Sequence, residues 1–275
     1  MTTKAYATIT SPNSNFSQNS DGSLTVKCNN PSGANIKFFV DLPNGTRRHT
    51  SNATTSTSYT WSASQILALL QYIPNANSSS IKVGVATLVN NVEKYWDGKV
   101  GTLNVVNSNP TFNNFIYADV NSKTTALTGN NQYLVKGYSK VTVTISTANK
   151  AVAKNYASIS KYRLVIGEQS VEASYSSSSA VTLTLDKVTS NTMYVYAIDS
   201  RGNSTVKQIS ASQFISYSKP VITQFVANRT GGVESETTVV IKGIWWNGNF
   251  GSVQNSFDTR ALYYKLTDRK STRLN

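Results

Sequence analysis

The sequence contains almost no cysteine or histidine. Its 275 residues include one cysteine, Cys28, and one histidine, His49. A single cysteine excludes an intrachain disulfide, and one residue of each type is too few for a zinc site, which normally has several such ligands. Cys28 shares one face of an alternating run with Leu24 and Val26, so we expect a buried structural thiol. His49 follows an Asn-Gly turn, and we expect it in a solvated loop.

Signals for catalysis are also scarce. A serine–histidine–acid triad would have to use His49 with a positioned nucleophile and carboxylate, and nothing in the sequence points to them. The phosphate-binding pattern GxxxxGK[ST] does not occur. Glycosidases need only two carboxylates, and the candidates in principle are Asp97, Asp119, Glu168, Glu172, Glu234 and Glu236. Each is better explained as a surface charge, so we predict a non-enzymatic protein without cofactor or metal.

Charged residues make up only 14% of the chain, yet the formal net charge is +13. The lysines and arginines are scattered rather than grouped into the basic stripe that nucleic-acid binding usually requires, so we expect no nucleic-acid partner. Two interpretations of the charge stay open. The surface is simply cationic, or it speeds encounters with an anionic polymer such as a Gram-positive cell wall.

Long hydrophobic runs are missing as well. No stretch reaches the ~18 apolar residues of a membrane helix, and the start of the chain lacks the apolar core of a signal peptide. We therefore expect no membrane insertion, and folding in a reducing cytoplasm.

The abundant residues are Val, Ile, Thr and Tyr, which favour strands. Strict alternation appears in both halves of the chain, with apolar faces at Ile36, Phe38, Val40 and Leu42; at Ile81, Val83 and Val85; at Val141, Val143 and Ile145; at Tyr162, Leu164 and Ile166; and at Val181, Leu183 and Leu185. Strands at this spacing, separated by turn residues, predict an all-β protein of tandem immunoglobulin-like or fibronectin-like β-sandwiches.

One helix interrupts this pattern. Ser62 and Gln65 have the spacing of a capping box. Ile66, Leu69, Leu70 and Ile73 form an apolar stripe at helical spacing, and Pro74 ends it. We predict a helix over residues 64–73 that packs as a lid on the first sandwich.

Polar, proline-containing stretches at residues 104–111 and at Tyr217–Pro220 mark domain boundaries. We predict a β-sandwich domain with one short helix over residues 1–109, an immunoglobulin-like sandwich over 110–218, and a truncated third β domain over 219–267. Residues 268–275 are similar to the translation of a short-read sequencing adapter. We expect them to be an artefact and the natural protein to continue beyond them.

Aromatic residues are plentiful, with 15 Tyr, 9 Phe and 4 Trp. Tyr and Trp rings can cover the apolar face of a sugar, although most of these rings are expected to fill the sandwich cores. Trp245 and Trp246 end an apolar strand predicted over Thr238–Trp246, so one should point inward and the other outward. The outward one is the candidate surface contact.

Several segments together resemble a known family. They are Tyr217–Ile222, Arg229–Glu234, Gly243–Gly251 with Asn255, Tyr263–Lys265, the Val195–Gly202 segment, and Trp61 with Ile73–Ala76 downstream. In order and spacing they are similar to minor structural proteins, of unknown function, from siphoviruses of streptococci and related Gram-positive bacteria. The resemblance spans most of residues 1–267 and implies a tail or baseplate component of the virion, assembled in the host cytoplasm.

The sequence thus favours a modular, non-enzymatic stalk. Its expected partners are other phage tail proteins, and Gram-positive cell-wall polysaccharide or teichoic acid. Two alternatives stay open: a carbohydrate-binding or adhesion module attached to a missing cell-wall hydrolase, and a bacterial surface adhesin. The complete open reading frame with its neighbouring genes would discriminate between them.

Overall fold

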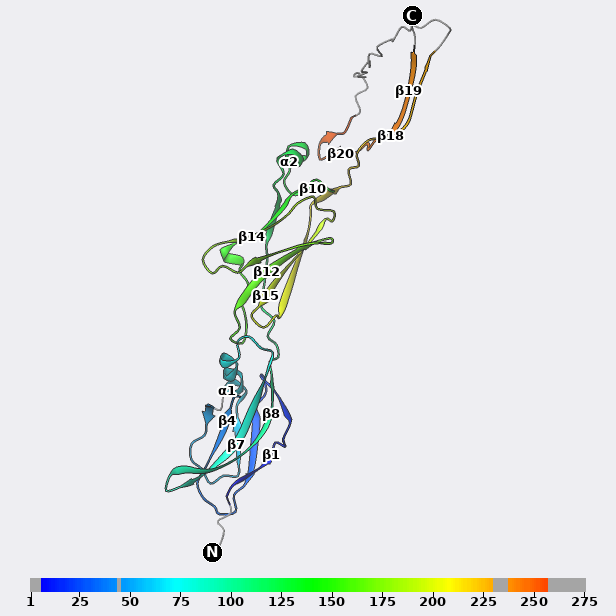
Figure 1. The fold of residues 1–275 in the computed structure, drawn as a ribbon. Helices are drawn as coiled ribbons and strands as arrows, with labels where there is room; N and C mark the ends of the chain where they lie inside the picture. Colours follow the sequence, from blue (N-terminus) through cyan, green and yellow to red (C-terminus); the bar gives the residue numbers. More distant parts are fainter. Residues whose placement is uncertain (1–5, 44–45, 230–236, 257–275) are drawn as a thin grey trace, which may run out of the picture.

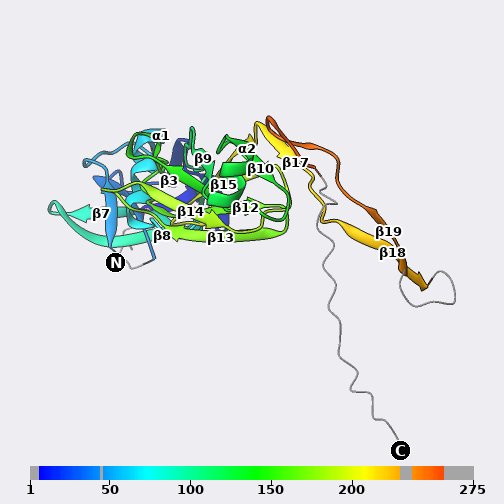
Figure 2. The same cartoon turned by 90° about the horizontal axis from the view of Figure 1, so that it is seen from above.

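The computed structural model describes residues 6–43, 46–229 and 237–256. Its elements follow one another along an elongated molecule, with two packed β domains in a row and a smaller β segment beyond them (Figure 1). Seen along the long axis, the two domains overlap and the hairpin of β18 and β19 projects to one side (Figure 2). The prediction of an all-β fold is confirmed.

Two facing sheets form the first sandwich. The three-stranded sheet has the order β1-β3-β6 and the five-stranded sheet the order β2-β8-β7-β4-β5. The strands are β1 (Thr8–Ser11), β2 (Phe16–Asn19), β3 (Leu24–Asn29), β4 (Ile36–Asp41), β5 (Arg47–Thr50), β6 (Ser58–Trp61), β7 (Ser78–Val89) and β8 (Val92–Asn104). Most pairs are antiparallel, but β2 runs parallel to β8.

The alternation in β4 places its side chains as predicted. Ile36, Phe38 and Val40 are completely buried in the first core. Ile81, Val83 and Val85 of β7 lie in the same core and are at most 1% exposed. Phe39 lies on the other face of the sheet, where the guanidinium of Arg47 covers its ring at 4.2 Å. Cys28 is a buried free thiol, as expected, and burial raises its pKa.

The predicted helix is α1 (Ala63–Ala68), which continues as the 3₁₀ helix η1 (Leu69–Tyr72). Its capping box is formed: the Ser62 side chain accepts from the amide of Gln65, and the Gln65 side chain accepts from the amide of Ser62. Ile66, Leu69 and Leu70 are fully buried in the first core. The helix therefore covers one end of the sandwich, at the side facing the second domain (Figure 1).

His49 does not lie in a solvated loop, and that expectation was wrong. It belongs to β5, is half-buried, and its Nε2 lies 2.8 Å from the carbonyl oxygen of Gln65. Its ring also packs 5.7 Å from that of the buried Trp61. The preceding turn at Asn44–Gly45 falls outside the described residues.

The second sandwich joins a three-stranded sheet of order β14-β11-β9 to a four-stranded sheet of order β13-β12-β15-β16, beside a parallel pair β10-β17. Its strands are β9 (Ile116–Asp119), β10 (Tyr133–Val135), β11 (Val141–Ile145), β12 (Ile159–Ile166), β13 (Gln169–Ser174), β14 (Val181–Leu185), β15 (Thr192–Asp199), β16 (Ser204–Ser210) and β17 (Gln213–Ile215). The apolar faces predicted for β11, β12 and β14 meet in one core that draws on residues from Phe112 to Phe214.

A second helix, α2 (Ser122–Thr128), was not predicted, and a 3₁₀ turn, η2 (Thr147–Asn149), is also present. The sequence of α2 is mostly polar and threonine-rich, so it has no apolar stripe. Its end signals are local: the Asn121 side chain accepts from the amide of Lys123, and Gly129 ends the helix with φ +66°. The helix lies at the end of the second sandwich that faces the last segment (Figure 1).

The last segment contains two small sheets, β18 (Val221–Arg229) with β19 (Thr237–Ile244), and β20 (Asn249–Phe250) with β21 (Val253–Gln254). Strand β19 ends at Ile244, whereas the strand was predicted to run to Trp246, so Trp245 and Trp246 lie beyond its end. Phe250 is buried with Val135 and Ile215 of the second sandwich, and the ring of Trp246 packs against this cluster. Several expectations concern residues outside the described ranges: Tyr263–Lys265, Glu234, Glu236 and the run 268–275.

Candidate functional site

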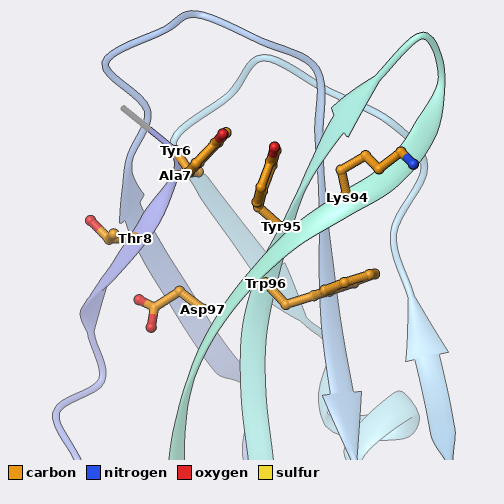
Figure 3. A pocket seen from close by; sticks show the side chains of 7 residues that line it. All are labelled: Tyr6, Ala7, Thr8, Lys94, Tyr95, Trp96 and Asp97. Atoms are coloured by element: carbon orange, nitrogen blue, oxygen red, sulfur yellow. The ribbon is translucent and has the colours of Figure 1, made fainter. Parts of the chain in front are cut away.

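An aromatic pocket lies at the N-terminal end of the molecule, between β1 and the twisted part of β8. It has a volume of about 390 Å³ and is lined by Tyr6, Ala7, Thr8, Lys94, Tyr95, Trp96 and Asp97. Figure 3 shows these side chains, with the rings of Tyr6 and Tyr95 next to each other and Asp97 on the same side of β8, and with Lys94 and Trp96 pointing to the opposite side of the strand. The exposed fractions are 38% for Tyr6, 40% for Tyr95 and 54% for Trp96.

The local backbone explains how the rings of Tyr6 and Tyr95 meet. In the pairing of β7 with β8, Thr87 faces Tyr95 and the next residue, Leu88, faces Glu93. Lys94 therefore has no partner in β7 and forms a bulge in β8. Such a bulge increases strand twist and redirects side chains. On the β1 side, the amide of Ile9 donates to Asp97 Oδ2 at 2.6 Å, and the amide of Ala7 donates to Thr87 Oγ1 at 3.1 Å. These bonds fix the start of β1 beside β8.

The indole of Trp96 is held by a chain of polar contacts. Its Nε1 donates to Glu93 Oε2 at 3.1 Å, and the same carboxylate is paired with the guanidinium of Arg47. Arg47 in turn covers Phe39 and lies 6.0 Å from the Trp96 ring. Burial alone would raise the pKa of Glu93, but the hydrogen bonds from Trp96 and Arg47 and the Arg47 charge outweigh it and hold the pKa below its usual value.

The two tyrosines form a stacked pair. Their ring centroids lie 3.4 Å apart with an interplanar angle of 24°. Hydrogen bonding with Tyr95 is the main reason why the pKa of Tyr6 lies above its usual value, so the Tyr6 hydroxyl stays protonated at neutral pH. The pair therefore offers hydroxyl groups next to apolar ring surface.

A second site lies between the two sandwiches, where Arg201 is only 7% exposed. Arg201 stands in the turn after β15. The Asp199 carboxylate accepts from the amides of Arg201 and Asn203 at 2.9 Å and 2.8 Å, and Gly202 adopts a φ of +84° that favours glycine. The turn thereby directs the guanidinium toward the first domain.

The guanidinium of Arg201 is surrounded by backbone carbonyl groups from both domains. Nε donates to Ala76 at 3.0 Å and to Ile73 at 3.3 Å, and Nη2 donates to Ile73 at 3.2 Å and to Asn155 at 2.7 Å, with longer contacts to Leu70, Ser108 and Lys154. Burial lowers the pKa of Arg201, but arginine remains charged in proteins. The carbonyl groups at the end of η1 offset this buried charge.

Further hydrogen bonds surround Arg201. Ser200 Oγ donates to the carbonyl of Pro74 at 2.6 Å, and Asn77 Nδ2 donates to the carbonyl of Arg201 at 3.2 Å. Asn203 Nδ2 donates to Asn77 Oδ1 at 3.0 Å. The turn after β15 is thus bound to the segment that follows η1, and the contact can fix the angle between the domains.

The sequence-predicted contact residues lie at the far end of the molecule. Trp245 and Trp246 are both half-buried. The Trp246 ring packs 5.7 Å from Tyr217 and 4.9 Å from Phe250. Because both follow the end of β19, the alternation argument does not apply to them. Their role as a surface contact remains a prediction.

The candidate carboxylates are dispersed. Asp97 lines the aromatic pocket, whereas Asp119 is buried in the second sandwich and accepts hydrogen bonds from Thr124 and Ser139 at 2.5 Å and 2.6 Å. Glu172 pairs with Lys161 at 2.7 Å, and Glu168 is exposed in the turn before β13. Within the described residues, no group of three or more metal-ligating side chains that could hold an ion is found.

Sequence reasoning missed the aromatic pocket and the Arg201 contact. A local signal existed for each. Tyr95 and Trp96 are adjacent aromatic residues in a strand, and Arg201 lies in the turn that carried part of the family resemblance. The sequence could not show that Tyr6 lies beside Tyr95, or that the turn after β15 meets residues 70–77 of the first domain.

The fold and these sites define a modular all-β protein of immunoglobulin-like sandwiches. A family model described as siphovirus protein of unknown function matches residues 13–244. The chain belongs to this family, which supports a structural role in a phage. Among the described residues, none of the helices has the length and apolar character needed to span a membrane.

No curated protein sequence matches the chain. Solved structures match at low identity. The fibronectin(III)-like modules of Clostridium thermocellum CbhA are 11% identical, with 76% of this chain and 94% of that chain covered and a TM-score of 0.27. DIP-gamma IG1+IG2 is 10% identical, with 77% of this chain and 99% of that chain covered and a TM-score of 0.30. The Bacteroides ovatus glucan-locus protein SGBP-B, solved with a mixed-linkage heptasaccharide, is 12% identical, with 75% of this chain and 47% of that chain covered and a TM-score of 0.26. Scores this low carry no functional information.

Proposed function

We propose that the chain is a non-enzymatic component of the siphovirus tail or baseplate, where it acts as a stalk made of β-sandwich modules. The observation that supports this most directly is the Arg201 contact, which ties one sandwich to the next through buried hydrogen bonds. A spacer must hold its modules at a constant angle, and a charged group buried among carbonyls resists separation, because removing a partner leaves buried polar groups unpaired.

The proposed partners are other tail proteins and the wall of a Gram-positive host, through its polysaccharide or teichoic acid. Streptococci and related bacteria are the proposed hosts. Family membership favours this assignment over a bacterial surface adhesin. The aromatic pocket favours a second candidate function, a carbohydrate-binding module joined to a cell-wall hydrolase. The complete open reading frame discriminates between them, because a hydrolase domain in the same chain would support the second candidate.

Immunogold labelling tests the location. Antibodies raised against the purified chain should label the tails of intact phage particles in electron micrographs. Labelling of the capsid, or the absence of the chain from purified virions, would contradict the proposal.

Solution scattering tests the stalk. The wild-type chain should give the profile of one elongated arrangement, and Arg201→Ala should broaden the distribution of interdomain distances while circular dichroism stays unchanged. Arg201→Lys should be intermediate, because an ammonium lacks the planar fork of donors. Arg163→Ala is the matched control, since Arg163 lies on β12 over the ring of Tyr196 in the same sandwich. Identical profiles for wild type and Arg201→Ala would show that this contact does not hold the domains.

A further inference from the structure

One face of the hairpin formed by β18 and β19 is apolar along its length. Side chains alternate between the two faces of a sheet, so residues that pair across the strands lie on the same face. Ile222 joins this face because its partner, Gly243, lies two residues from Ile241. We call the surface the apolar face, and its side chains are Ile222, Phe225, Ala227, Val239 and Ile241.

The other face of the hairpin has a different character. Polar and apolar pairs alternate along it: the polar pairs are Gln224–Lys242 and Asn228–Thr238, and the apolar pairs are Val221–Ile244 and Val226–Val240. On the apolar face, the exposed fractions are 66% for Ile222, 62% for Phe225, 43% for Ile241 and 37% for Val239. Because a two-stranded hairpin alone is marginally stable, and grouped exposed apolar side chains mark interaction sites, a partner is needed on this face.

Charge limits the kind of partner that fits. The chain carries a formal net charge of +13, so two copies repel each other over most of their surface. Within residues 221–228 and 238–244 the only charged side chain is that of Lys242, which belongs to the other face of the hairpin. At the apolar face, two copies can therefore meet without bringing like charges together. An anionic polymer finds no counter-charge there.

The sizes of the side chains also fit a contact of the face with itself. The bulky pair Phe225–Ile241 lies next to the smaller pair Ala227–Val239. When a second hairpin faces the first about a two-fold axis between these two rows, each bulky pair meets the smaller pair of the other copy. Large side chains opposite small ones let facing layers interdigitate. Such an isologous contact uses the same patch on both copies.

The position of the hairpin leaves room for this contact. It lies beyond the second sandwich and projects to one side of the long axis (Figure 1, Figure 2). Two chains can bring their hairpins face to face while their basic sandwiches stay apart, which limits the repulsion between them.

We propose that the apolar face binds the apolar face of a second copy of this chain, so that two stalks are joined at their β18–β19 hairpins. Five apolar side chains on each copy are far fewer than the ~20–30 residues a side of a standard interface. The pairing is therefore weak in dilute solution and increases with protein concentration. It goes beyond the role of a stalk and does not depend on the tail assignment.

A cross-linking experiment on the full chain tests the contact. Ala227→Cys places a thiol on the apolar face, and Asn228→Cys places one on the other face, at the next exposed position of the same strand. The native Cys28 is buried, so the wild-type chain gives the background. A short bismaleimide joins two thiols, because each sulfur adds to one maleimide ring. Denaturing gel electrophoresis measures the covalent dimer at several protein concentrations.

The two cysteine variants should differ clearly. We expect Ala227→Cys to give at least ten-fold more covalent dimer than Asn228→Cys, because only the first thiol faces the partner copy. Adding Phe225→Ser to Ala227→Cys should reduce the dimer to the level of Asn228→Cys. Adding Val206→Ser instead, at an exposed position of β16, is the matched control and should leave the dimer unchanged. Circular dichroism of each variant checks that the fold is retained.

Three results would overturn the proposal. Equal cross-linking of Ala227→Cys and Asn228→Cys would mean that the hairpins meet through their strand edges or without specificity. Absence of dimer, with rapid labelling of Ala227→Cys by a monofunctional maleimide, would leave the face for a different protein. Absence of dimer with slow labelling would mean that the same chain covers the face. Antibody labelling of tails does not depend on the cross-link, so the two proposals fail separately.

Discussion

Two buried charges show how differently single residues can be accommodated in this chain. The guanidinium of Arg201 is surrounded by carbonyl oxygen atoms from two domains. The carboxylate of Asp41 is 9% exposed, and its Oδ1 lacks a hydrogen-bond partner within the described residues. The guanidinium of Arg47 lies close to this oxygen, with Nε 4.0 Å from Oδ1. The buried charge of Arg201 is therefore stabilised by hydrogen bonds, whereas the buried charge of Asp41 is only partly stabilised by nearby cations.

Asp41 therefore gives a prediction about pH. Burial raises its pKa in the folded state, and the charges of Arg47 and Lys82 only partly oppose this. A carboxyl group with a raised folded pKa stabilises the fold when protonated, and this contribution is lost as the pH rises through the folded pKa. At pH 7 the ionised group then costs stability. Asp41→Asn should therefore be more stable than wild type there.

Urea unfolding at several pH values measures this effect. The advantage of Asp41→Asn should disappear below about pH 3.9, where the carboxyl group is protonated in the unfolded chain as well. Asp186→Asn, at an exposed turn position, is the control. A variant less stable than wild type at pH 7 would mean that the Asp41–Arg47 contact outweighs the cost of burial.

Among the elements, strands were predictable and their ends less so. Alternation placed Ile36, Phe38 and Val40 in the core because one face of β4 must be buried whatever its partners are. Helix α1 was predictable because its cap and its apolar stripe agree. Helix α2 was not, since only its local end signals at Asn121 and Gly129 distinguish it from a polar loop. The end of β19 before Trp245 depends on packing with the second sandwich, which the sequence does not reveal.

The capping box of α1 provides a prediction at this scale. Ser62→Ala removes the acceptor for the Gln65 amide and should lower the free energy of unfolding by about 1 kcal/mol. Ser122→Ala is the matched control, because Ser122 is the exposed first residue of α2, whose cap is Asn121. Denaturant midpoints measure both. Equal losses in the two variants would mean that the cap of α1 contributes nothing specific.

The hairpin of β18 and β19 leads to a third prediction. In the described residues it is a two-stranded sheet, and such a hairpin alone is marginally stable. Ile222, Phe225 and Ile244 are each more than 60% exposed. We expect the full chain to associate as its concentration rises, and replacement of all three by serine to abolish this. A chain ending at Ser218 should be more soluble than the full chain.

Sedimentation velocity checks the association. Val206→Ser, at an exposed position of β16 in the second sandwich, is the control and should associate like wild type. The same association in wild type and the triple serine variant would show that the hairpin is not the contact surface.

At the scale of the whole molecule, the sequence predicted two consecutive sandwiches but not what lies at the ends and between them. Tyr6 and Tyr95 are 89 positions apart, and Arg201 follows Leu70 by 131 positions. Periodicity assigns a residue to a face of its own strand, but it carries no information about which distant segment lies beside it. The aromatic pocket and the Arg201 contact both depend on such long-range neighbours.

Without residues 268–275, which carry three basic and one acidic side chain, the net charge of +13 falls to +11, and this charge gives the last prediction, which concerns the whole surface. Purified Gram-positive walls that carry teichoic acid should retain the chain in 0.1 M salt. Most of this binding should be lost in 1 M salt, because the Debye length falls from ~10 Å to ~3 Å. Walls stripped of teichoic acid should lose the salt-sensitive part alone. The part that survives high salt should weaken in Trp96→Ala if the pocket is responsible, and in Trp245→Ala or Trp246→Ala if the far end is. Retention that disappears completely in high salt would leave charge as the sole cause and the chain as a spacer.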